Sequence, residues 1–500
     1  MGLGRWVRVR QRVAPVHLAA AASLAMVVAA CSAGGSSPTP APSASGMPSA
    51  SPTASATASA VGRTPVIIDV DMDSSDTMAL PYLLRDPSLD VLAVTVVGTG
   101  LVHCNAGLQN ANAILATLGV DGVPVTCGRD EPLAGTHAFP AEWREAADSA
   151  YGLALERRGV SMPAEDAPAL IRSLAASTEP PITVLALGPL TNVAEALQVD
   201  PELAGQIERI VAMGGAIDVS GNVALDEAYT QLRPAEWNVY ADPAAADIVI
   251  RSGVPITLVP LDATDDVPID AAFFAALEAD HAAAPADIVY ELLARRGVGG
   301  GEYLWDPLAS VIAIDDSVAT FDTMKLRVET AEGPDSGRTI RADNGTPVRV
   351  ATSADRAAFE QRFLAGLRVG APRPNPFALA GTISVTFDGR SCIDDAPDTI
   401  AAGDWAFDVE TTFAETTAVG VVVFHEGSGW DDLLTYFDTA SDPTNQPPFL
   451  DVAAMTGLEG PSSTRMIASL TPGTYGTVCL TFGGDTSNAA AGSGPFTVGP

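Results

Sequence analysis

Short apolar runs alternate with Ala/Leu-rich stretches between residue 64 and about residue 319. The runs lack polar alternation, as expected of parallel strands that are covered on both faces. They span residues 65–70, 91–97, 182–187, 207–213 and 255–260, with helix-like segments such as 110–118 and 191–198 between them. The pattern predicts an α/β domain over residues 63–370, with a mostly parallel sheet flanked by helices.

The pattern changes at residues 371–374, where the sequence reads Ala-Pro-Arg-Pro. Beyond this point the helical signal stops, and strands are expected at 382–387, 418–424 and 475–482 between Gly, Pro and Asp turns. Residues 376–500 are therefore predicted to form an all-β sandwich, an accessory domain without a catalytic cluster. Its Cys392 and Cys479 lie near its two ends and could join them, and pairing within each region would also join Cys104 to Cys127.

The first 31 residues are typical of an export signal. Four arginines precede an apolar run over 13–30, which ends in small residues directly before Cys31. This arrangement resembles a bacterial lipoprotein signal in which Cys31 becomes the lipidated residue. A plain secretory signal or a membrane anchor is the alternative, although the Ala-rich run is marginal for spanning a bilayer. Residues 32–62 are uncharged and rich in Ser, Pro, Thr and Ala, as in a tether. We expect an exported membrane lipoprotein, in a compartment that permits disulfides.

Composition limits the partners. The 500 residues are too many for one ordinary domain, and 47% hydrophobic residues exclude global disorder. Lys and Arg number 27 against 61 Asp and Glu, which gives a net charge of −34. A phosphate backbone would be repelled, so nucleic acid is not an expected partner. The acids are scattered, as on a soluble acidic surface.

The densest chemistry follows the first predicted strand. Asp69, Asp71, Asp73 and Asp76 place four carboxylates in eight residues, just before a helix expected from residue 77. Ligands gather at the carboxyl ends of parallel strands. Crowded carboxylates repel one another unless a cation neutralises them, and oxygen ligands select calcium or magnesium.

Three other interpretations of this cluster are weaker. An EF-hand loop fails because Ser74 stands where glycine is needed and Leu80 where the bidentate glutamate is needed. The Asp-x-Asp start resembles haloacid-dehalogenase-type phosphatases, but those need a downstream lysine. Lys325, the one lysine in the chain, lies beyond every catalytic candidate. An acidic loop without a metal would explain one or two aspartates better than four.

Further motifs continue in order along the chain. They are Val97-Gly98, the turn 187–192 (Leu-Gly-Pro-Leu-Thr-Asn), Met213-Gly214-Gly215 with Gly221-Asn222, Glu236-Trp237-Asn238 with Asp242-Pro243, and Trp305-Asp306-Pro307-Leu308. With the Asp-rich start, this set resembles the inosine-uridine-type nucleoside hydrolases. The resemblance implies a Ca²⁺ ion held by Asp71, Asp76, Asp306 and the carbonyl of Leu187, with Asp71 as the general base on a water.

The resemblance also implies the substrate contacts. Asn222, Glu236 and Asn238 would bind the ribose and Met213 would pack on it, whereas ordinary loop capping is the alternative role. Ser75 stands where the family usually has a ribose-binding aspartate, Asp73 where it usually has glycine, and Thr99 where many members have asparagine.

Trp305 stands where some members of the family place a histidine that acts as the general acid. Purine-preferring members use tryptophan to stack on the base. We therefore predict that Trp305 stacks on a purine, although it could be a core aromatic. Phe139 or Trp143 could cover the opposite face. His137 is the best titratable candidate nearby, and the glycine-rich run 297–301 is either a lid hinge or a plain turn.

The resulting hypothesis is calcium-dependent hydrolysis of the N-glycosidic bond of purine ribonucleosides, giving free base and ribose for salvage. The alternatives are a nucleoside-binding lipoprotein that does not cleave its ligand, and a metal-dependent phosphatase. Family members commonly form dimers or tetramers, so the resemblance allows a homo-oligomer.

Overall fold

The computed structural model describes residues 62–156, 165–179, 181–223, 235–298, 301–374, 377–440, 447–458, 460–482 and 489–499. The predicted signal, Cys31 and the tether up to residue 61 lie outside these residues, as do residues 299 and 300 of the glycine-rich run. Within the described ranges, no helix combines the length and the apolar character needed to cross a membrane.

A nine-stranded sheet organises the described residues between 64 and 354, in the order β3-β2-β1-β4-β5-β6-β9-β7-β8. β1 to β6 pair in parallel with their neighbours, β9 joins β6 in parallel, and β7 is antiparallel to both β8 and β9. This confirms the predicted α/β fold with a mostly parallel sheet. The strands are β1 Thr64–Val70, β2 Leu89–Val96, β3 Val125–Cys127, β4 Ile182–Ala186, β5 Ile207–Met213, β6 Ile256–Val259, β7 Ala319–Val328, β8 Thr339–Arg341 and β9 Thr346–Ala354.

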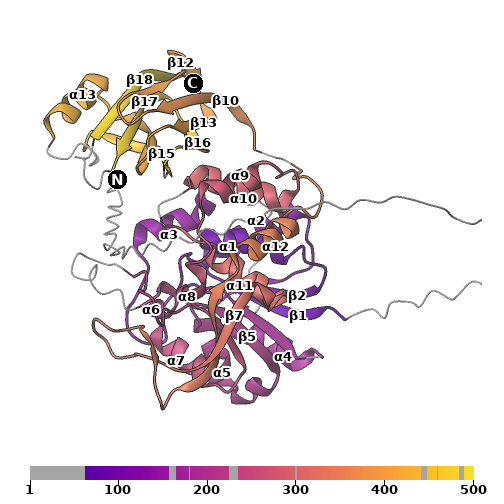
Figure 1. Ribbon diagram of the computed structural model, residues 1–500. Coiled ribbons are helices and arrows are strands. Elements are labelled where there is room, and N and C mark those ends of the chain that lie inside the picture. Colours follow the sequence, from indigo (N-terminus) through magenta and orange to yellow (C-terminus); the bar gives the residue numbers. More distant parts are fainter. Residues whose placement is uncertain are drawn as a thin grey trace, which may run out of the picture. The chain divides into compact units, whose positions relative to one another are not determined.

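Helices cover both faces of this sheet. Figure 1 shows α1, α10, α11 and α12 on one side and α4, α5 and α7 on the other. Each side has its own core of buried apolar residues, because strands buried on both faces need a partner layer on each. The α-helices are α1 Ser74–Leu83, α2 Cys104–Leu118, α3 Ala141–Asp148, α4 Ala167–Ser177, α5 Thr191–Val199, α6 Trp237–Ala241, α7 Pro243–Arg251, α8 Leu261–Thr264, α9 Ala271–Glu278, α10 Ala284–Arg296, α11 Trp305–Ile314 and α12 Arg356–Leu367.

The C-terminal region forms two further sheets around a separate apolar core. Their orders are β11-β10-β13-β16 and β12-β18-β17-β14-β15. The expectation that helical structure stops here was wrong, because α13 (Trp430–Thr439) packs its Leu433 against a small apolar cluster. The strands are β10 Leu379–Phe387, β11 Cys392–Asp394, β12 Thr399–Ala401, β13 Gly403–Thr411, β14 Thr417–Phe424, β15 Leu450–Leu458, β16 Ser462–Leu470, β17 Gly473–Thr481 and β18 Ala489–Gly499.

Two disulfides join the four cysteines of the described residues, Cys104 to Cys127 and Cys392 to Cys479. The predicted pairing within each region is confirmed. The first bond ties the start of α2 to β3, and the second ties β11 in one C-terminal sheet to β17 in the other. Such links restrict the unfolded chain, with a larger effect for the longer loop of the second bond.

A buried ion-pair network connects α10 to the segments that follow it. Glu291, whose side chain is fully buried, pairs with Arg295 at 2.8 Å and with Arg373 at 2.6 Å. Arg295 also pairs with Asp404 of β13 at 2.6 Å. A buried charge is tolerated only when it is paired, and Glu291 and Arg295 each have two partners of opposite charge.

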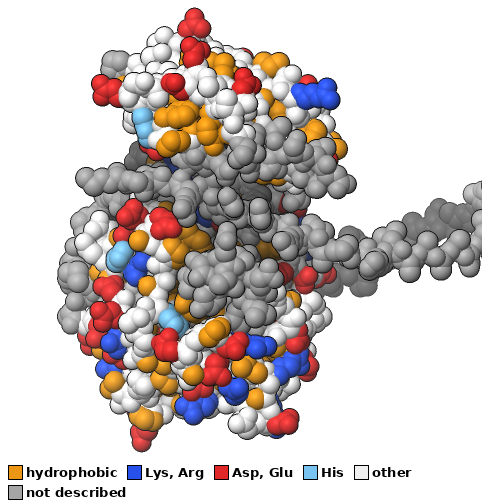
Figure 2. Space-filling model, turned by 90° about the vertical axis from the view of Figure 1, so that its left-hand side faces the viewer, with side chains coloured by type: hydrophobic (Ala, Val, Ile, Leu, Met, Phe, Trp, Pro, Cys, Tyr) orange, Lys and Arg blue, Asp and Glu red, His pale blue; other side chains and the backbone are white. Residues whose placement is uncertain are grey.

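The surface charge is dispersed. Figure 2 shows acidic, basic and apolar side chains interspersed on the face that it presents. The visible acids do not form one continuous patch, which agrees with the scattered acids of the sequence.

Candidate active site

The loop between β1 and α1 is shaped by a helix cap. Asp73 is the N-cap of α1, and its Oδ1 accepts the backbone N–H of Asp76 at 2.6 Å. The residue before it, Met72, has a positive φ of 56°, which turns the chain sharply between strand and helix. This geometry turns the acidic residues of the loop toward the carboxyl edge of the sheet.

Asp71 is buried at the end of β1 and is held by backbone groups. Its Oδ2 accepts the N–H of Leu101 at 2.9 Å, and its own N–H donates to Asp76 Oδ2 at 2.7 Å. Gly100 and Gly188 lie against it so closely that a Cβ at either position would meet the Asp71 side chain. Both glycines are therefore needed for the approach of three loops to one carboxylate.

Asp306 reaches the same place from the first turn of α11. Its Oδ2 accepts a hydrogen bond from the Ser75 hydroxyl, which joins positions 231 residues apart. Asp76 is fully buried and Asp306 is 2% exposed, yet the Oδ1 atom of each has no hydrogen-bond partner among the described residues. Buried carboxylate oxygens without partners are the ligands that a hard divalent cation requires.

Burial and mutual repulsion make these acids reluctant to ionise. Burial, followed by the charge of Asp73, raises the pKa of Asp71 to about 7. The pKa values of Asp76 and Asp306 lie well above the ordinary range, because of burial first and then of neighbouring carboxylates. A bound cation would offset both effects, so the residues fit the metal that the sequence implies.

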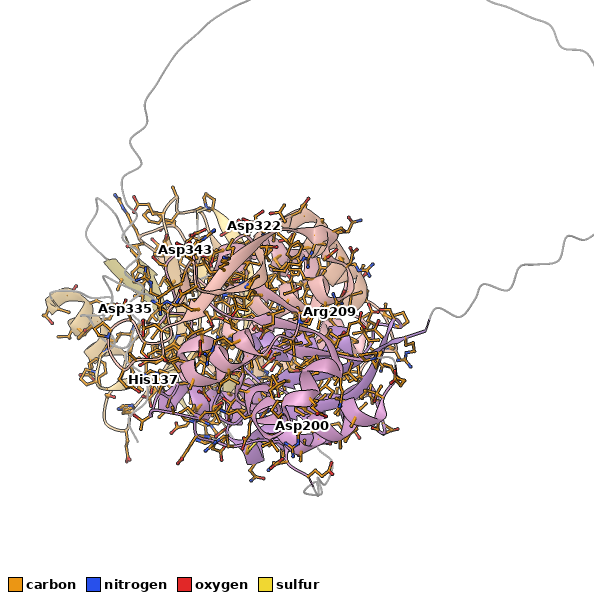
Figure 3. All side chains as sticks on the ribbon, turned by 90° about the horizontal axis from the view of Figure 1, so that it is seen from below. His137, Asp200, Arg209, Asp322, Asp335 and Asp343 are labelled. Carbon is orange, nitrogen blue, oxygen red and sulfur yellow. A yellow bond between two sulfur atoms is a disulfide. The ribbon has the colours of Figure 1, made fainter. Side chains whose placement is uncertain are left out.

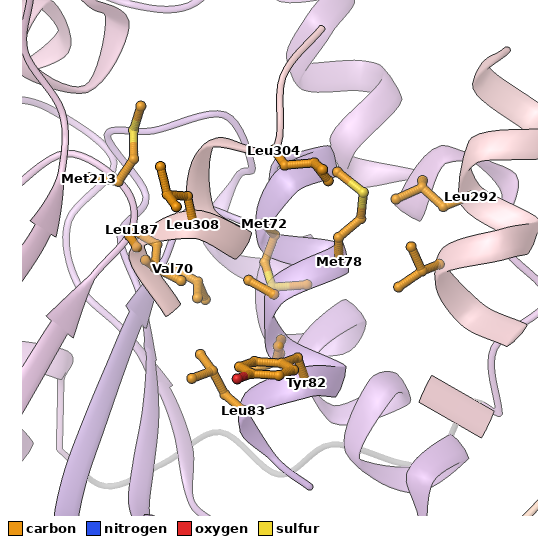
Figure 4. Close-up of a cluster of buried hydrophobic side chains, with 14 of the residues drawn as sticks. Val70, Met72, Met78, Tyr82, Leu83, Leu187, Met213, Leu292, Leu304 and Leu308 are labelled. Atoms are coloured by element: carbon orange, nitrogen blue, oxygen red, sulfur yellow. The ribbon is translucent and has the colours of Figure 1, made fainter. Parts of the chain in front are cut away.

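The carbonyl of Leu187 lies directly after β4, beside β1 in the sheet. It accepts a hydrogen bond from Asn238 Nδ2 at 2.9 Å, and the same amide contacts the carbonyl and the sulfur of Met213. The structure thus brings Leu187, Met213 and Asn238 together. Figure 4 shows Val70, Leu187, Met213 and Leu308 in the apolar cluster at this end of the strands.

Glu236 and Asn222 have capping roles in this structure. Glu236 is buried at the N-cap of α6 and accepts the N–H groups of Gly215, Asn238 and Val239 at 2.9, 2.9 and 3.2 Å. Asn222 Oδ1 accepts the N–H of Trp237 at 3.1 Å. These contacts match the alternative role for both residues, and their contact with ribose stays a prediction.

Trp305 is the first residue of α11, next to Asp306. The centroids of its ring and of the Tyr303 ring lie 6.1 Å apart. Its Nε1 is buried without a hydrogen-bond partner among the described residues. Phe139 and Trp143 instead pack on Trp237, with ring centroids 4.9 and 5.3 Å away. The described ring contacts therefore do not pair Phe139 or Trp143 with Trp305.

His137 is held away from the carboxylates. Its Nδ1 lies 2.7 Å from the Tyr240 carbonyl, its Nε2 lies 3.1 Å from Glu332, and its ring stacks on Tyr240. Figure 3 draws His137 on the same side of the view as Asp335. The structure does not bring His137 into contact with the predicted cation ligands.

Residues 66–361 match the family described as inosine-uridine preferring nucleoside hydrolase. The match covers more than half of the chain. The chain belongs to the inosine-uridine preferring nucleoside hydrolase family. This membership confirms the expected family and the expectation of an N-ribosyl hydrolase, and it sets the phosphatase alternative aside. Lys325, which that alternative required, is exposed on β7 and donates to the Asp343 carbonyl at 3.2 Å.

Curated relatives of this nucleoside hydrolase are named for uridine or pyrimidine substrates. A probable uridine nucleosidase 1 of Oryza sativa subsp. japonica is 30% identical over 286 residues, which are 56% of this chain and 85% of that protein. A pyrimidine-specific ribonucleoside hydrolase of Shewanella sp. (strain MR-7) is 37% identical over 205 residues, 41% of this chain. The matched part spans 61% of that relative, less than two thirds of its length.

Solved structures share the fold. A plant nucleoside hydrolase superposes with a TM-score of 0.54 at 27% identity, covering 61% of this chain and 99% of that one. A purine-preferring ribonucleoside hydrolase from Gardnerella vaginalis gives 0.52 at 26% identity, covering 61% and 98%. Members of the family generally bind a metal ion, for which the carboxylates of this hydrolase are suited.

Three features of the site were not foreseen in the sequence. Asp69 lies behind the cluster and accepts hydrogen bonds from Thr95 at 2.6 Å and from Asn192 at 2.8 Å. Thr99 bonds to the Thr191 hydroxyl at 2.8 Å. Tyr151 has a positive φ of 53° and a buried hydroxyl without a hydrogen-bond partner among the described residues. Burial, followed by the charge of Asp73, raises the pKa of this hydroxyl.

Titration of the cluster predicts the pH dependence of the metal-free hydrolase. The pKa of Asp69 and that of Asp71 are each raised from 3.8 to about 7, mainly by burial. Between pH 4 and pH 7, Asp69 and Asp71 are protonated in the folded state and ionised in the unfolded state. The free energy of unfolding therefore falls as pH rises from about 4 to 7. Thermal melts of chelator-treated protein across this range should show a steeper decline for the parent than for Asp71→Asn. Parallel profiles for the two proteins would contradict the assignment.

Proposed function

We propose that this chain is a calcium-dependent hydrolase of the N-glycosidic bond of ribonucleosides, with purine nucleosides preferred, and that it releases free base and ribose for salvage. The observation that carries the proposal is the clustering of Asp71, Asp76 and Asp306, whose charges raise one another's pKa, with Gly188, the residue after Leu187, packed against Asp71. Two of these carboxylates have buried oxygens without partners among the described residues. Calcium suits this set because it accepts six to eight oxygen ligands in flexible geometry.

Asp71, Asp76, Asp306 and the Leu187 carbonyl would hold the cation. When bound, the cation supplies positive charge that offsets the carboxylates and makes a nearby water more acidic. Asp71 Oδ2 is committed to the Leu101 N–H, whereas Oδ1 receives only a long 3.4 Å contact from the Asp73 N–H. Oδ1 is therefore the atom that takes a proton from the attacking water.

The water oxygen forms a bond to the anomeric carbon while the bond to the base nitrogen breaks, and the base leaves with that electron pair. Positive charge develops on the sugar, and the surrounding carboxylates favour it electrostatically. Asn238 is already oriented by the Leu187 and Met213 carbonyls, so its amide oxygen is fixed for a sugar hydroxyl. The leaving base must still gain a proton, either from a side chain of the protein or from solvent.

Purines and pyrimidines are the two candidates for the preferred base. Trp305 supports purines, because a large indole beside Asp306 can stack on a bicyclic base, and its half-buried ring is fixed at the start of α11. The names of the curated relatives favour pyrimidines or uridine instead. A third outcome, capture of nucleosides without cleavage, would be consistent with the loss of the aspartate at position 75.

We also propose that residues 1–31 direct export and that lipid on Cys31 anchors the chain outside the cytoplasmic membrane. Residues 32–62 would be the tether and residues 376–500 an accessory domain after the catalytic domain 63–370. Support comes from the small residues before Cys31, the uncharged tether and the two disulfides, which suit an oxidising compartment. Whether copies of the chain associate stays a prediction.

Replacing Asp71 by asparagine removes the proposed base while keeping the acceptor for the Leu101 N–H. We expect base release to fall about 10²- to 10⁴-fold, the range for a lost general base. The assay measures free base and reducing sugar from inosine, adenosine, guanosine, uridine and cytidine, with calcium and after chelation. Asp322→Asn, at an exposed position on β7, is the control. If the parent binds a nucleoside by calorimetry but releases no base, the chain is a binding protein.

Trp305 is tested by changing its ring. Trp305→Leu should lower kcat/KM for inosine relative to uridine about three- to tenfold, since aromatic stacking contributes about 0.5–1.5 kcal/mol. Trp305→Phe keeps a flat ring and should retain part of the ratio. An unchanged ratio in both variants would exclude stacking by Trp305, and a parent that cleaves only uridine and cytidine would establish the pyrimidine preference.

The anchor is tested by fractionation of bacteria that express the chain. Cys31→Ser removes the thiol that would carry lipid, and we expect the protein to leave the membrane fraction. Ser32→Ala is the control and should stay with the membrane. If the Cys31→Ser protein remains membrane-bound and resists washing with salt and carbonate, an uncleaved anchor explains the segment better.

A further inference from the structure

Two residues of the acidic loop, Asp73 and Ser75, contact each other. The Ser75 hydroxyl lies 3.3 Å from Asp73 Oδ2 and also hydrogen-bonds to Asp306 Oδ2. One hydroxyl carries one hydrogen, so it cannot donate fully to both carboxylates. Asp73 and Asp306 therefore share a single hydroxyl hydrogen, and Ser75 cannot satisfy both carboxylates at once.

Asp73 has one oxygen that the helix does not need. Its Oδ1 caps α1 through the Asp76 N–H, as an N-cap residue should, but its Oδ2 faces Ser75 and Asp306. Carboxylate oxygens of Asp71, Asp73 and Asp76 lie within 4.8 Å of one another. The helix cap explains why an acceptor stands at position 73. It does not explain why the second oxygen of a charged group points into a cluster of acids.

Little positive charge from the chain compensates this cluster. Arg296 lowers the pKa of Asp73, yet its guanidinium is paired with Glu302 at 2.8 Å. Asp76 and Asp306, at 0% and 2% exposure, each have a buried Oδ1 without a partner among the described residues. These two oxygens are independent of the Asp73 cap, and a bound cation would satisfy both of them.

We propose that Asp73 adds a fourth carboxylate to the cation site of this chain, beside those of Asp71, Asp76 and Asp306. Asp73 reaches the cluster from the N-cap of α1, and the Ser75 hydroxyl links it to Asp306. This inference rests on the proposed calcium site, and it concerns cation binding rather than turnover.

The test is calcium binding to the purified full chain by isothermal titration calorimetry, with thermal melts with and without calcium. Asp73→Asn keeps the capping oxygen and removes the charge, so calcium affinity should fall about tenfold or more because ligand charge sets affinity. Its melting temperature without calcium should stay the same or rise, since a like-charge contact is lost. Asp355→Asn, at the exposed N-cap of α12 that accepts the Ala358 N–H at 3.0 Å, is the matched control and should change neither property.

The double variant Asp73→Asn with Ser75→Asp returns one negative charge to the loop and should restore part of the affinity, since charge beside the site attracts the cation. Parental affinity in Asp73→Asn would show that Asp73 is only a helix cap and would overturn the inference, and a double variant as weak as the single one would exclude an effect of the loop's charge. A parent that binds no calcium would also overturn the inference. A parent that binds calcium but releases no base would refute the proposed hydrolysis alone.

Discussion

Repulsion between carboxylates at the carboxyl edge of the sheet is the interaction on which this site depends. Asp71, Asp76 and Asp306 are almost completely buried, and each raises the pKa of at least one of the others or has its own pKa raised by them. Such a group of acids destabilises the metal-free fold unless protons or a cation offset the charge. The same repulsion therefore links fold stability, pH and cation binding.

The scaffold holds these acids in place with neutral groups rather than with basic side chains. Backbone N–H groups of Asp71, Asp76 and Leu101 donate to the carboxylates. Val70 and Met72, on either side of Asp71 in the chain, belong to the apolar cluster of Figure 4. Because the partners are dipoles, the negative charge of the cluster remains available to a cation. A lysine or arginine at the same place would stabilise the metal-free fold and weaken the site.

The parallel sheet could be predicted because its strands are uninterrupted apolar runs, and the acidic loop because four aspartates follow such a run. The antiparallel strand β7 was harder to recognise, since exposed and buried residues are mixed along it. The position of Asp73 Oδ2 could not be predicted, because it depends on Asp306, which follows far along the chain. Nor could the packing of Phe139 and Trp143 on Trp237, which three separate segments determine.

The place of Asp73 at the N-cap of α1 limits what this carboxylate can offer a cation. An aspartate on the second residue of a helix has both oxygens available, whereas an N-cap aspartate has committed one of them to the helix. Long-range attraction for a cation depends on total charge, and short-range coordination depends on the number of available oxygens. On the proposed assignment, Asp73 adds a full negative charge to the cation site but only one available oxygen, Oδ2. Rearrangement of the loop around the cation would then begin at Ser75, whose single proton is already shared between two carboxylates.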